Sequence, residues 1–381
     1  MRFAFTEQQL ELRTAVRQVL DRECTTADLR AITDTDDHGA GRSAERWAVL
    51  SELGAPGVLV AENHGGLGLT DVELVGVLEE AGWAGLPEPL AESAALAAPL
   101  LAAAAGLAAD GAAAHAVAER SLPQLASGEL VATVGGVDVT VDGLVTATRP
   151  APDVTQGTVV TERVAGASRA GLFLLAWEAP GLGWQVHAVP ADAVDVTATP
   201  SIDGTRDLGT VAWTPWPHTV IASGAHATTV VGDLADHVAV AYAAELLGLA
   251  DRMITIAADY AKDRQQFGKP IGSFQAVKHH LANARVKLEF ARPATYRAAD
   301  SLARQLPDRS EHASMAKALA SDAADLAARV ALQVHGAIGY TWECDLQLFM
   351  KRAWALSAAG GDATTHRARV LAAALDRLAP S

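Results

Sequence analysis

The chain has 381 residues, of which half are hydrophobic and 20% are charged. That length allows two or three domains with a large buried core, and the composition argues against disorder. Because 30 Lys and Arg face 45 Asp and Glu, the net charge of −15 disfavours nucleic acid or an anionic membrane as the main partner. Two cysteines, Cys24 and Cys344, are too few for a disulfide framework, which predicts a reducing, cytoplasmic location.

The N-terminal region, residues 1–125, has the pattern of helices broken by loops. Its start, MRFAFTEQQLELR, is polar and amphipathic, so we expect no signal peptide. Thr6 is a candidate N-cap for a helix that places Leu10, Val16 and Leu20 on one face. A Gly-rich loop and Ala-rich helices follow to about residue 120, and the uncharged stretch 93–109 is too weakly hydrophobic to span a bilayer.

The middle region, residues 126–225, is rich in Val and Thr, with frequent Gly, Pro and Asp. Short runs such as ELVATVGG, TVVTERVAG, AGLFLLAWEA, WQVHAVPA and GTVAWTPW have the composition and spacing of antiparallel strands. We therefore predict a compact antiparallel β domain here.

Helical periodicity returns in the last region, residues 226–381. The pattern predicts one long helix that ends near Arg264, a second with Phe274, Val277, Leu281, Ala284 and Leu288 on one stripe, and three more. The fold class is α+β and mainly α, with an N-terminal helical domain, a middle antiparallel β domain and a C-terminal four-helix bundle.

Two glycine-containing loops interrupt the C-terminal helices. In DRQQFGKPIGSF, Gly268 and Pro270 end one helix and Gly272 and Ser273 begin the next. Backbone amides at that second N-terminus, with Arg264 nearby, would suit a phosphate. A plain helix–helix turn whose arginine makes a surface salt bridge explains the same spacing.

The second loop is QVHGAIGYTWE, residues 333–343. Gly336 and Gly339 allow close approach of the backbone, and Gln333 offers a hydrogen bond to a ligand. The three-glycine spacing and the preceding strand of a Rossmann fingerprint are absent. A simple helix C-cap is the alternative explanation.

Together these segments carry a resemblance to a family. RQQFGKPIGSFQAVKHHLA and QVHGAIGYTWECDLQLFMKRA resemble the paired C-terminal signatures of the acyl-CoA dehydrogenase flavoprotein family. LSELGAPGVLVAENHGGLGL and VLEEAG resemble its N-terminal helical domain, and SIDGTRDLG resembles the end of its middle β domain. The resemblance implies the same order of helical domain, β domain and four-helix bundle.

The resemblance also implies a cofactor and a reaction. Members of the family bind FAD at a subunit interface and remove hydrogens from Cα and Cβ of an acyl thioester. Carried over to this chain, the FAD contacts would come from Arg264, Gln266, Phe267, Ile271, Phe274, Gln275, Gln333, Gly336 and Ala337. Ala337 replaces the usual second glycine, and its methyl group is a mild departure.

The catalytic base is where the sequence departs from the family. The commonest catalytic Glu would fall at about Gly360, and Asp362, two residues later, is short and displaced. Glu245 is the only charged residue in 238–250, and a carboxylate in apolar surroundings makes a stronger general base. Alternatively, Glu245 belongs to a small and polar stripe with Ala241, Gly248, Arg252 and Asp259 that faces solvent.

The middle domain departs as well, because the family's Asn-Gly-x-Lys turn and its flavin-contacting Trp strand are not recognisable. Trp177 sits after the expected place and is better explained by packing. His279, His280 and His335 have no carboxylate or cysteine at ligand spacing, so we expect no metal site. No Gly-x-Ser-x-Gly elbow supports a hydrolase.

Three hypotheses follow. The first is an FAD-dependent acyl-thioester α,β-dehydrogenase with Glu245 as base and an electron-transfer flavoprotein-like acceptor. The second is a non-catalytic subunit that completes FAD sites in a heteromeric dehydrogenase, for example of the steroid side-chain type. AAELLG, which resembles subgroups that include steroid side-chain dehydrogenases, supports the first hypothesis, because some family members place the base on this helix. The third is a flavin-dependent oxygenase on the same scaffold. Each implies an oligomer, a dimer or a tetramer, and the acyl group and its carrier, coenzyme A or a protein, stay open.

Overall fold

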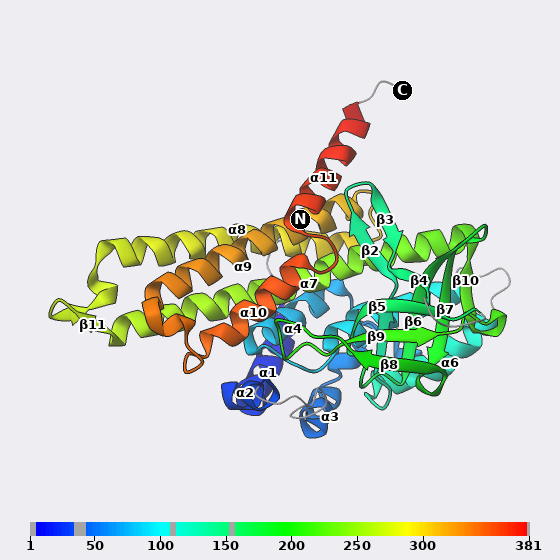
Figure 1. Cartoon of the computed structure of the whole chain (residues 1–381), viewed down its shortest axis with the longest axis horizontal. Coiled ribbons are helices and arrows are strands. Elements are labelled where there is room, and N and C mark those ends of the chain that lie inside the picture. Colours follow the sequence, from blue (N-terminus) through cyan, green and yellow to red (C-terminus); the bar gives the residue numbers. More distant parts are fainter. Residues whose placement is uncertain (1–4, 34–42, 107–111, 152–156, 379–381) are drawn as a thin grey trace. The chain divides into compact units, whose positions relative to one another are not determined.

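The computed structural model describes residues 5–33, 43–106, 112–151 and 157–378 (Figure 1). The chain forms two compact units. The bundle unit comprises Met1–Arg30, Val75–Leu86 and Ala239–Ser381, and the sheet unit comprises Ala31–Leu74 and Pro87–Val238. The predicted division into three domains stays a prediction.

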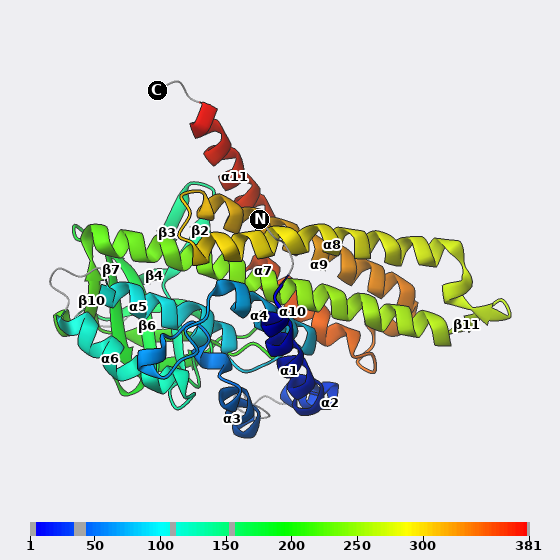
Figure 2. The same ribbon diagram turned by 180° about the vertical axis from the view of Figure 1, so that it is seen from behind.

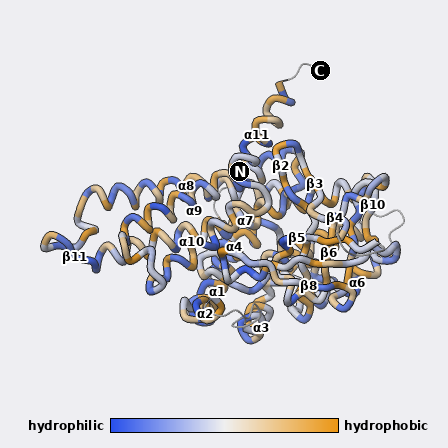
Figure 3. Tube along the Cα trace, in the orientation of Figure 1, coloured by the Kyte–Doolittle hydropathy of each residue, from blue (hydrophilic) through white to orange (hydrophobic). Residues whose placement is uncertain are grey.

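Long helices dominate the bundle unit. They are α1 (Glu7–Glu23), α4 (Asp71–Ala84), α7 (Gly224–Asp263), α8 (Gln275–Ala303), α9 (Arg309–His335), α10 (Leu346–Ala358) and α11 (Ala363–Leu378), with α4 and α7 beginning in the sheet unit. Figures 1 and 2 both show α8 and α9 running alongside the second half of α7. Hydrophobic and hydrophilic colours alternate along α8 and α9 in Figure 3, as expected for helices that bury one face.

Helix α1 shows how well local signals predict a helix start. The Thr6 side chain accepts a hydrogen bond from the Gln9 amide, and the Gln9 side chain accepts one from the Thr6 amide. This reciprocal capping box confirms the N-cap prediction. Val16 and Leu20 are fully buried, whereas Leu10 is 48% exposed, so of the three residues expected on one face only Val16 and Leu20 belong to the core.

A charged cluster joins α1, α4 and α8 inside the bundle unit. Arg13 pairs with Glu79 and with Glu80, and Arg292 pairs with Glu79 over 3.1 Å. The Tyr296 hydroxyl donates to Glu79, and burial beside that carboxylate raises the pKa of Tyr296. Because buried charges must be matched, the cluster fixes the register of three helices.

The sheet unit contains two four-stranded sheets, one two-stranded sheet and several short helices. Besides the first residues of α4 and α7, its helices are α3 (Ala44–Glu52), the π-helix η3 (Ala91–Ala97), α5 (Ala98–Gly106) and α6 (Ala112–Ala126). Its 3-10 turns are η1 (Ala55–Gly57), η2 (Glu62–His64), η4 (Ala191–Ala193) and η5 (Pro217–Thr219). Helix α2 (Thr26–Thr33) begins in the bundle unit and ends in the sheet unit. One sheet has the order β1 (Ala132–Gly135), β6 (Leu172–Ala179), β7 (Gly183–Pro190), β10 (Val220–Ser223). The other has the order β4 (Thr148–Pro150), β5 (Val159–Ala165), β9 (Leu208–Trp213), β8 (Val194–Ala198), and β2 (Val137–Thr140) pairs with β3 (Gly143–Thr146).

The core of this unit contains side chains from both four-stranded sheets. Val159 and Trp213 come from one sheet, Phe173 and Val189 from the other, and Trp177 packs against this cluster, as predicted. The five runs proposed as strands correspond to β1, β5, β6, β7 and β9. Pairing is antiparallel except between β1 and β6, which are parallel, a relation that strand composition does not reveal.

The fold of helices, a central β region and C-terminal helices is thus the predicted one. Among the residues that the structure describes, no helix is long and apolar enough to cross a membrane.

Candidate flavin site

The connection between α7 and α8 is a small hairpin. Strands β11 (Gln265–Gln266) and β12 (Lys269–Pro270) pair antiparallel, and the turn η6 (Ile271–Ser273) leads into α8. The two residues at the hairpin tip, Phe267 and Gly268, have φ values of +54° and +77°. Two successive left-handed residues make the tight turn that suits a hairpin, and the glycine adopts this conformation without strain.

This geometry corrects one detail of the prediction. Helix α7 already ends at Asp263 and α8 begins at Gln275, so Gly272 and Ser273 lie in a 3-10 turn before the helix and not at its first residues. A Cβ atom on Gly272 would lie 2.9 Å from the carbonyl oxygen of Ala261. The turn therefore folds back against the end of α7, which requires glycine.

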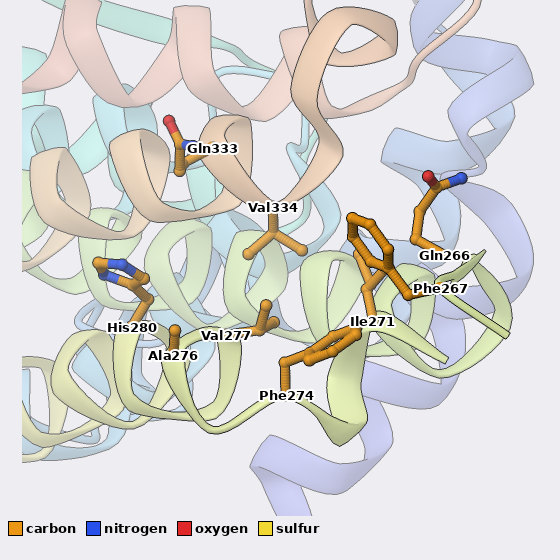
Figure 4. A pocket seen from close by; sticks show the side chains of 9 residues that line it. All are labelled: Gln266, Phe267, Ile271, Phe274, Ala276, Val277, His280, Gln333 and Val334. Atoms are coloured by element: carbon orange, nitrogen blue, oxygen red, sulfur yellow. The ribbon is translucent and has the colours of Figure 1, made fainter. Parts of the chain in front are cut away.

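A pocket opens between this connection and the end of α9. Its volume is about 340 Å³, and five of the predicted cofactor residues line it: Gln266, Phe267, Ile271, Phe274 and Gln333. Figure 4 shows Val334 of α9 pointing toward α8, with the rings of Phe267 and Phe274 turned toward one another. Those two rings meet edge to face, with centroids 6.0 Å apart.

The remaining lining residues were missed: Ala276, Val277, His280 and Val334. Two of them, Val277 and His280, continue the face of α8 that begins at Phe274, because helical periodicity places positions three and six residues later on the same side. The sequence signal for these two residues is that spacing, which by itself indicates packing as readily as a ligand surface. Val334 directly follows Gln333, and nothing in the sequence pattern indicates that its side chain lines the pocket.

Four predicted cofactor residues do not line this pocket. Arg264 and Gln275 are exposed on either side of the hairpin. Gly336 and Ala337, also exposed, lie in the 3-10 turn η7 (Gly336–Tyr340) just after α9. All four are close in sequence to lining residues.

The lining suits a flat, partly polar ligand. Phenylalanine, isoleucine and valine side chains form its apolar floor, while Gln266, His280 and Gln333 supply polar atoms. The Lys269 ammonium lies 4.5 Å from the centre of the Phe274 ring, a cation held at the pocket by an aromatic face. A planar ring system that carries an anionic group fits these features.

Glu245 lies in a different part of the bundle unit. It is 4% exposed, and its Oε2 accepts a hydrogen bond from Arg352 Nη2 over 3.1 Å. A Cβ atom on Gly82 would lie 2.0 Å from the Glu245 carbonyl oxygen, so α4 and α7 cross with almost no gap. The predicted burial is confirmed, and the alternative of a solvent-facing stripe through Glu245 is wrong because α4 and α10 cover that face.

Arg352 is the partner that sequence reasoning missed. It is 7% exposed and stands on α10 between the buried Phe349 and Leu356. Its place on an apolar helical stripe signalled burial, but a contact across 107 residues of sequence is not visible in a pattern. The guanidinium stabilises the charged form of the Glu245 carboxylate.

The turn between α10 and α11 contains no glutamate at the position usual for the base. Gly360 and Gly361 have φ values of +66° and +92°. Asp362 accepts a hydrogen bond from the Thr365 amide over 2.7 Å, and such bonds lower the pKa of Asp362 and weaken it as a base. Asp362 is therefore the cap of α11.

Two buried side chains hold this turn in place. Lys317 is fully buried, and its Nζ donates to the carbonyl oxygens of Ser357 and Gly361, each over 3.0 Å. His366 Nε2 donates to the Gly360 carbonyl oxygen over 2.9 Å, and burial lowers the pKa of His366 to about 4. In the described part of the chain, no three His, Cys, Asp or Glu side chains gather as metal ligands would.

Comparisons with known proteins identify the family. Residues 6–129 match the acyl-CoA dehydrogenase N-terminal domain, and residues 228–375 match the C-terminal domain. Acyl-CoA dehydrogenase IpdE2 of Mycolicibacterium smegmatis is 30% identical over 353 residues, which is 91% of this chain and 93% of that protein. Acyl-CoA dehydrogenase FadE34 of Mycobacterium tuberculosis is 36% identical over 82% of this chain, which spans 40% of that longer protein.

Solved structures share the fold. The ChsE4-ChsE5 complex from Mycobacterium tuberculosis matches over 100% of both chains, with a TM-score of 0.82 and 23% identity. Butyryl-CoA dehydrogenase from Megasphaera elsdenii matches over 98% of this chain and 100% of that chain, with a TM-score of 0.81 and 21% identity. The chain belongs to the acyl-CoA dehydrogenase family, whose members are FAD-dependent oxidoreductases.

Proposed function

We propose that this chain is a subunit of an oligomeric FAD-dependent acyl-CoA dehydrogenase, and that it completes a flavin site without supplying the catalytic base. One observation carries the proposal: Glu245 is engaged by Arg352, and the Gly360 turn has no carboxylate at the position usual for the base. A base must reach the substrate's α carbon, and a carboxylate 4% exposed and held by a guanidinium is poorly placed for that task.

The pocket between the hairpin and α9 supports a role in holding FAD. Phe267, Ile271 and Phe274 give an apolar surface, and Gln266 and Gln333 add polar atoms to the lining. We propose that Arg264 and Gln275, both exposed beside the hairpin, contact the phosphate-bearing part of the flavin dinucleotide. Gly336 and Ala337 would line its ADP part from the end of α9.

Exposed aromatic side chains near the two loops support an oligomer. Phe267 is 91% exposed, Tyr340 79% and Trp342 64%. Such a concentration of exposed aromatic area is typical of an interface. The ChsE4-ChsE5 structure, which has the same fold, is itself a complex of two different proteins. We therefore propose an adjoining subunit, the same or different, that shares the flavin.

A bound FAD would supply the acceptor for the hydride that leaves Cβ of the acyl thioester. This chain's residues bind and orient the dinucleotide and exclude water from its apolar side. In the proposed assembly the α proton would pass to a carboxylate of an adjoining subunit that is a different polypeptide, because this chain supplies no base. An electron-transfer flavoprotein-like acceptor would then take up the electrons. The acyl group would arrive as a coenzyme A thioester, and a carrier-protein thioester is the alternative.

A second candidate is a complete dehydrogenase with Glu245 as its base. The burial of Glu245 in an apolar helix favours it, because desolvation strengthens a carboxylate as a base. The two candidates differ in what Glu245 does for flavin reduction.

Anaerobic reduction of bound flavin by a set of acyl-CoAs separates the candidates. Wild type and Glu245→Gln would be compared in the full assembly. The readout is the loss of the visible absorbance band of oxidised FAD. We expect similar reduction rates in both if Glu245 is structural, provided that the variant keeps its fold. A loss of about 100-fold or more with the fold intact would establish Glu245 as the base.

A further inference from the structure

The two proposed flavin-binding segments begin at neighbouring helix ends, and one aromatic contact joins those ends. Tyr260 lies in the last turn of α7, and His335 is the last residue of α9. Their rings are stacked, with centroids 4.4 Å apart and planes inclined by 19°. His335 is 8% exposed.

Each ring is adjacent in sequence to one of these segments. The Tyr260 carbonyl oxygen accepts the Arg264 amide over 2.9 Å, and the Arg264 carbonyl oxygen accepts the Ile271 amide over 2.8 Å, which closes the hairpin. On the other side, His335 directly follows Gln333 and Val334, which line the pocket.

The orientation of the His335 ring is fixed by its own helix. Its Nδ1 lies 2.8 Å from the Ala331 carbonyl oxygen, and since a carbonyl oxygen only accepts, Nδ1 carries the hydrogen. A Cβ atom on Gly339 would lie 3.1 Å from the His335 Cβ, so η7 folds back over the same residue. The imidazole therefore cannot turn away from Tyr260 without breaking a hydrogen bond and disturbing η7.

We propose that the Tyr260–His335 stack is a positioning contact that sets the spacing of the two flavin-binding segments. The inference rests on the proposed function of the pocket. Neither ring lines the pocket, so the stack acts through the hairpin on one side and through Gln333 and Val334 on the other. Small displacements of binding groups reduce affinity strongly, so loss of the stack weakens FAD binding out of proportion to stability.

The test is FAD titration into the flavin-stripped assembly that contains this chain, with wild type, Tyr260→Leu, His335→Leu and the double variant. We expect the Kd for FAD to rise at least about 10-fold in each single variant, and the double variant to be little worse than either, because the two rings act as one contact. Tyr260→Phe keeps a stacking ring and loses only the hydroxyl, so its Kd should stay within about twofold of wild type.

A matched control separates positioning from general destabilisation. Leu302 is 1% exposed and lies near the far end of α8, about 40 Å along the helix from Gln275 at 1.5 Å per residue. Leu302→Val should lower the Tm by about as much as Tyr260→Leu or His335→Leu does, and it should leave the Kd for FAD unchanged. Hydrogen exchange of the flavin-free protein gives a readout without FAD: the Ile271 amide should exchange about 10-fold faster in Tyr260→Leu and at the wild-type rate in Leu302→Val.

Two results would overturn the inference, and a third would overturn the proposed function. Unchanged FAD affinity in Tyr260→Leu and His335→Leu removes the stack from any positioning role. A Kd that tracks Tm across all variants, Leu302→Val included, reduces the stack to ordinary packing. Failure of the wild-type assembly to bind FAD, with Ile271 exchange responding to the stack as expected, contradicts the function of the pocket alone.

Discussion

Replacing Arg352 with methionine tests whether the Glu245 carboxylate is held by a structural ion pair. The change removes the guanidinium that donates to Glu245 Oε2 over 3.1 Å, where the Arg352 and Glu245 side chains are 9% and 5% exposed. Methionine fills much of the same volume, so the main effect is that a buried carboxylate loses this charge. We expect a loss of about 3–5 kcal/mol in the free energy of unfolding.

Changing Glu245, alone or together with Arg352, should reduce the free energy of unfolding by different amounts. Glu245→Gln leaves an amide oxygen able to accept from Arg352, and we expect a smaller loss of about 1–3 kcal/mol. Glu245→Gln combined with Arg352→Met removes both charges together. The double variant should therefore be more stable than Arg352→Met alone, which is a positive coupling between the two positions.

Calorimetric and denaturant unfolding of the four proteins would measure these losses. Arg329→Met is the control, because Arg329 and Asp325 form an exposed pair on α9 and their separation should change stability by less than about 0.5 kcal/mol. The reasoning fails if Arg352→Met is as stable as wild type while Glu245→Gln stops flavin reduction at full stability. In that case the carboxylate works as a base and Arg352 does not hold it.

Three further predictions concern the hairpin, the helix crossing and acid pH. Phe267→Asn should stabilise the flavin-free chain by about 1 kcal/mol in unfolding measurements, because asparagine tolerates φ = +54° better than phenylalanine. The same change should weaken FAD binding, and an unchanged Kd in an FAD titration would contradict that expectation. Gly248→Ala should cost about 2 kcal/mol or more by unfolding, since its Cβ atom would lie 1.9 Å from the Glu79 carbonyl oxygen; a neutral effect would mean that the helices do not cross this closely. Burial lowers the pKa of His366 from 6.5 to about 4 in the folded chain, so the unfolded chain binds the proton first as the pH falls. The free energy of unfolding should therefore decrease by roughly 3 kcal/mol at most between about pH 6.5 and pH 4. His366→Gln, which can still donate to Gly360, should flatten that part of the pH–stability curve.

Local sequence signals were sufficient for most of the architecture. The helical periodicity of apolar residues predicted α7, α8 and α9, because long periodic segments have few alternative structures. Capping chemistry located the start of α1 at Thr6. The composition change near residue 129 located the strands, although the parallel pairing of β1 with β6 depends on topology.

The candidate site was predicted only in part, for physical reasons that concern particular residues. The residues that approach the pocket were named because motifs such as RQQFG are local, and five of them do line it. The hairpin itself was not foreseen, because strands of two residues have no periodicity and Phe-Gly is an unusual pair for its turn. The pairing of Glu245 with Arg352 and the stack of Tyr260 on His335 join distant segments, which no local pattern specifies.

The most direct measurement is the amount of FAD per polypeptide, with turnover of acyl-CoA, for this chain purified by itself and together with the subunit it assembles with. A site shared between subunits predicts less than one FAD per chain and no flavin reduction by acyl-CoA for the chain alone, with both restored in the assembly. One tightly bound FAD per chain and full turnover in the absence of any other polypeptide would contradict it.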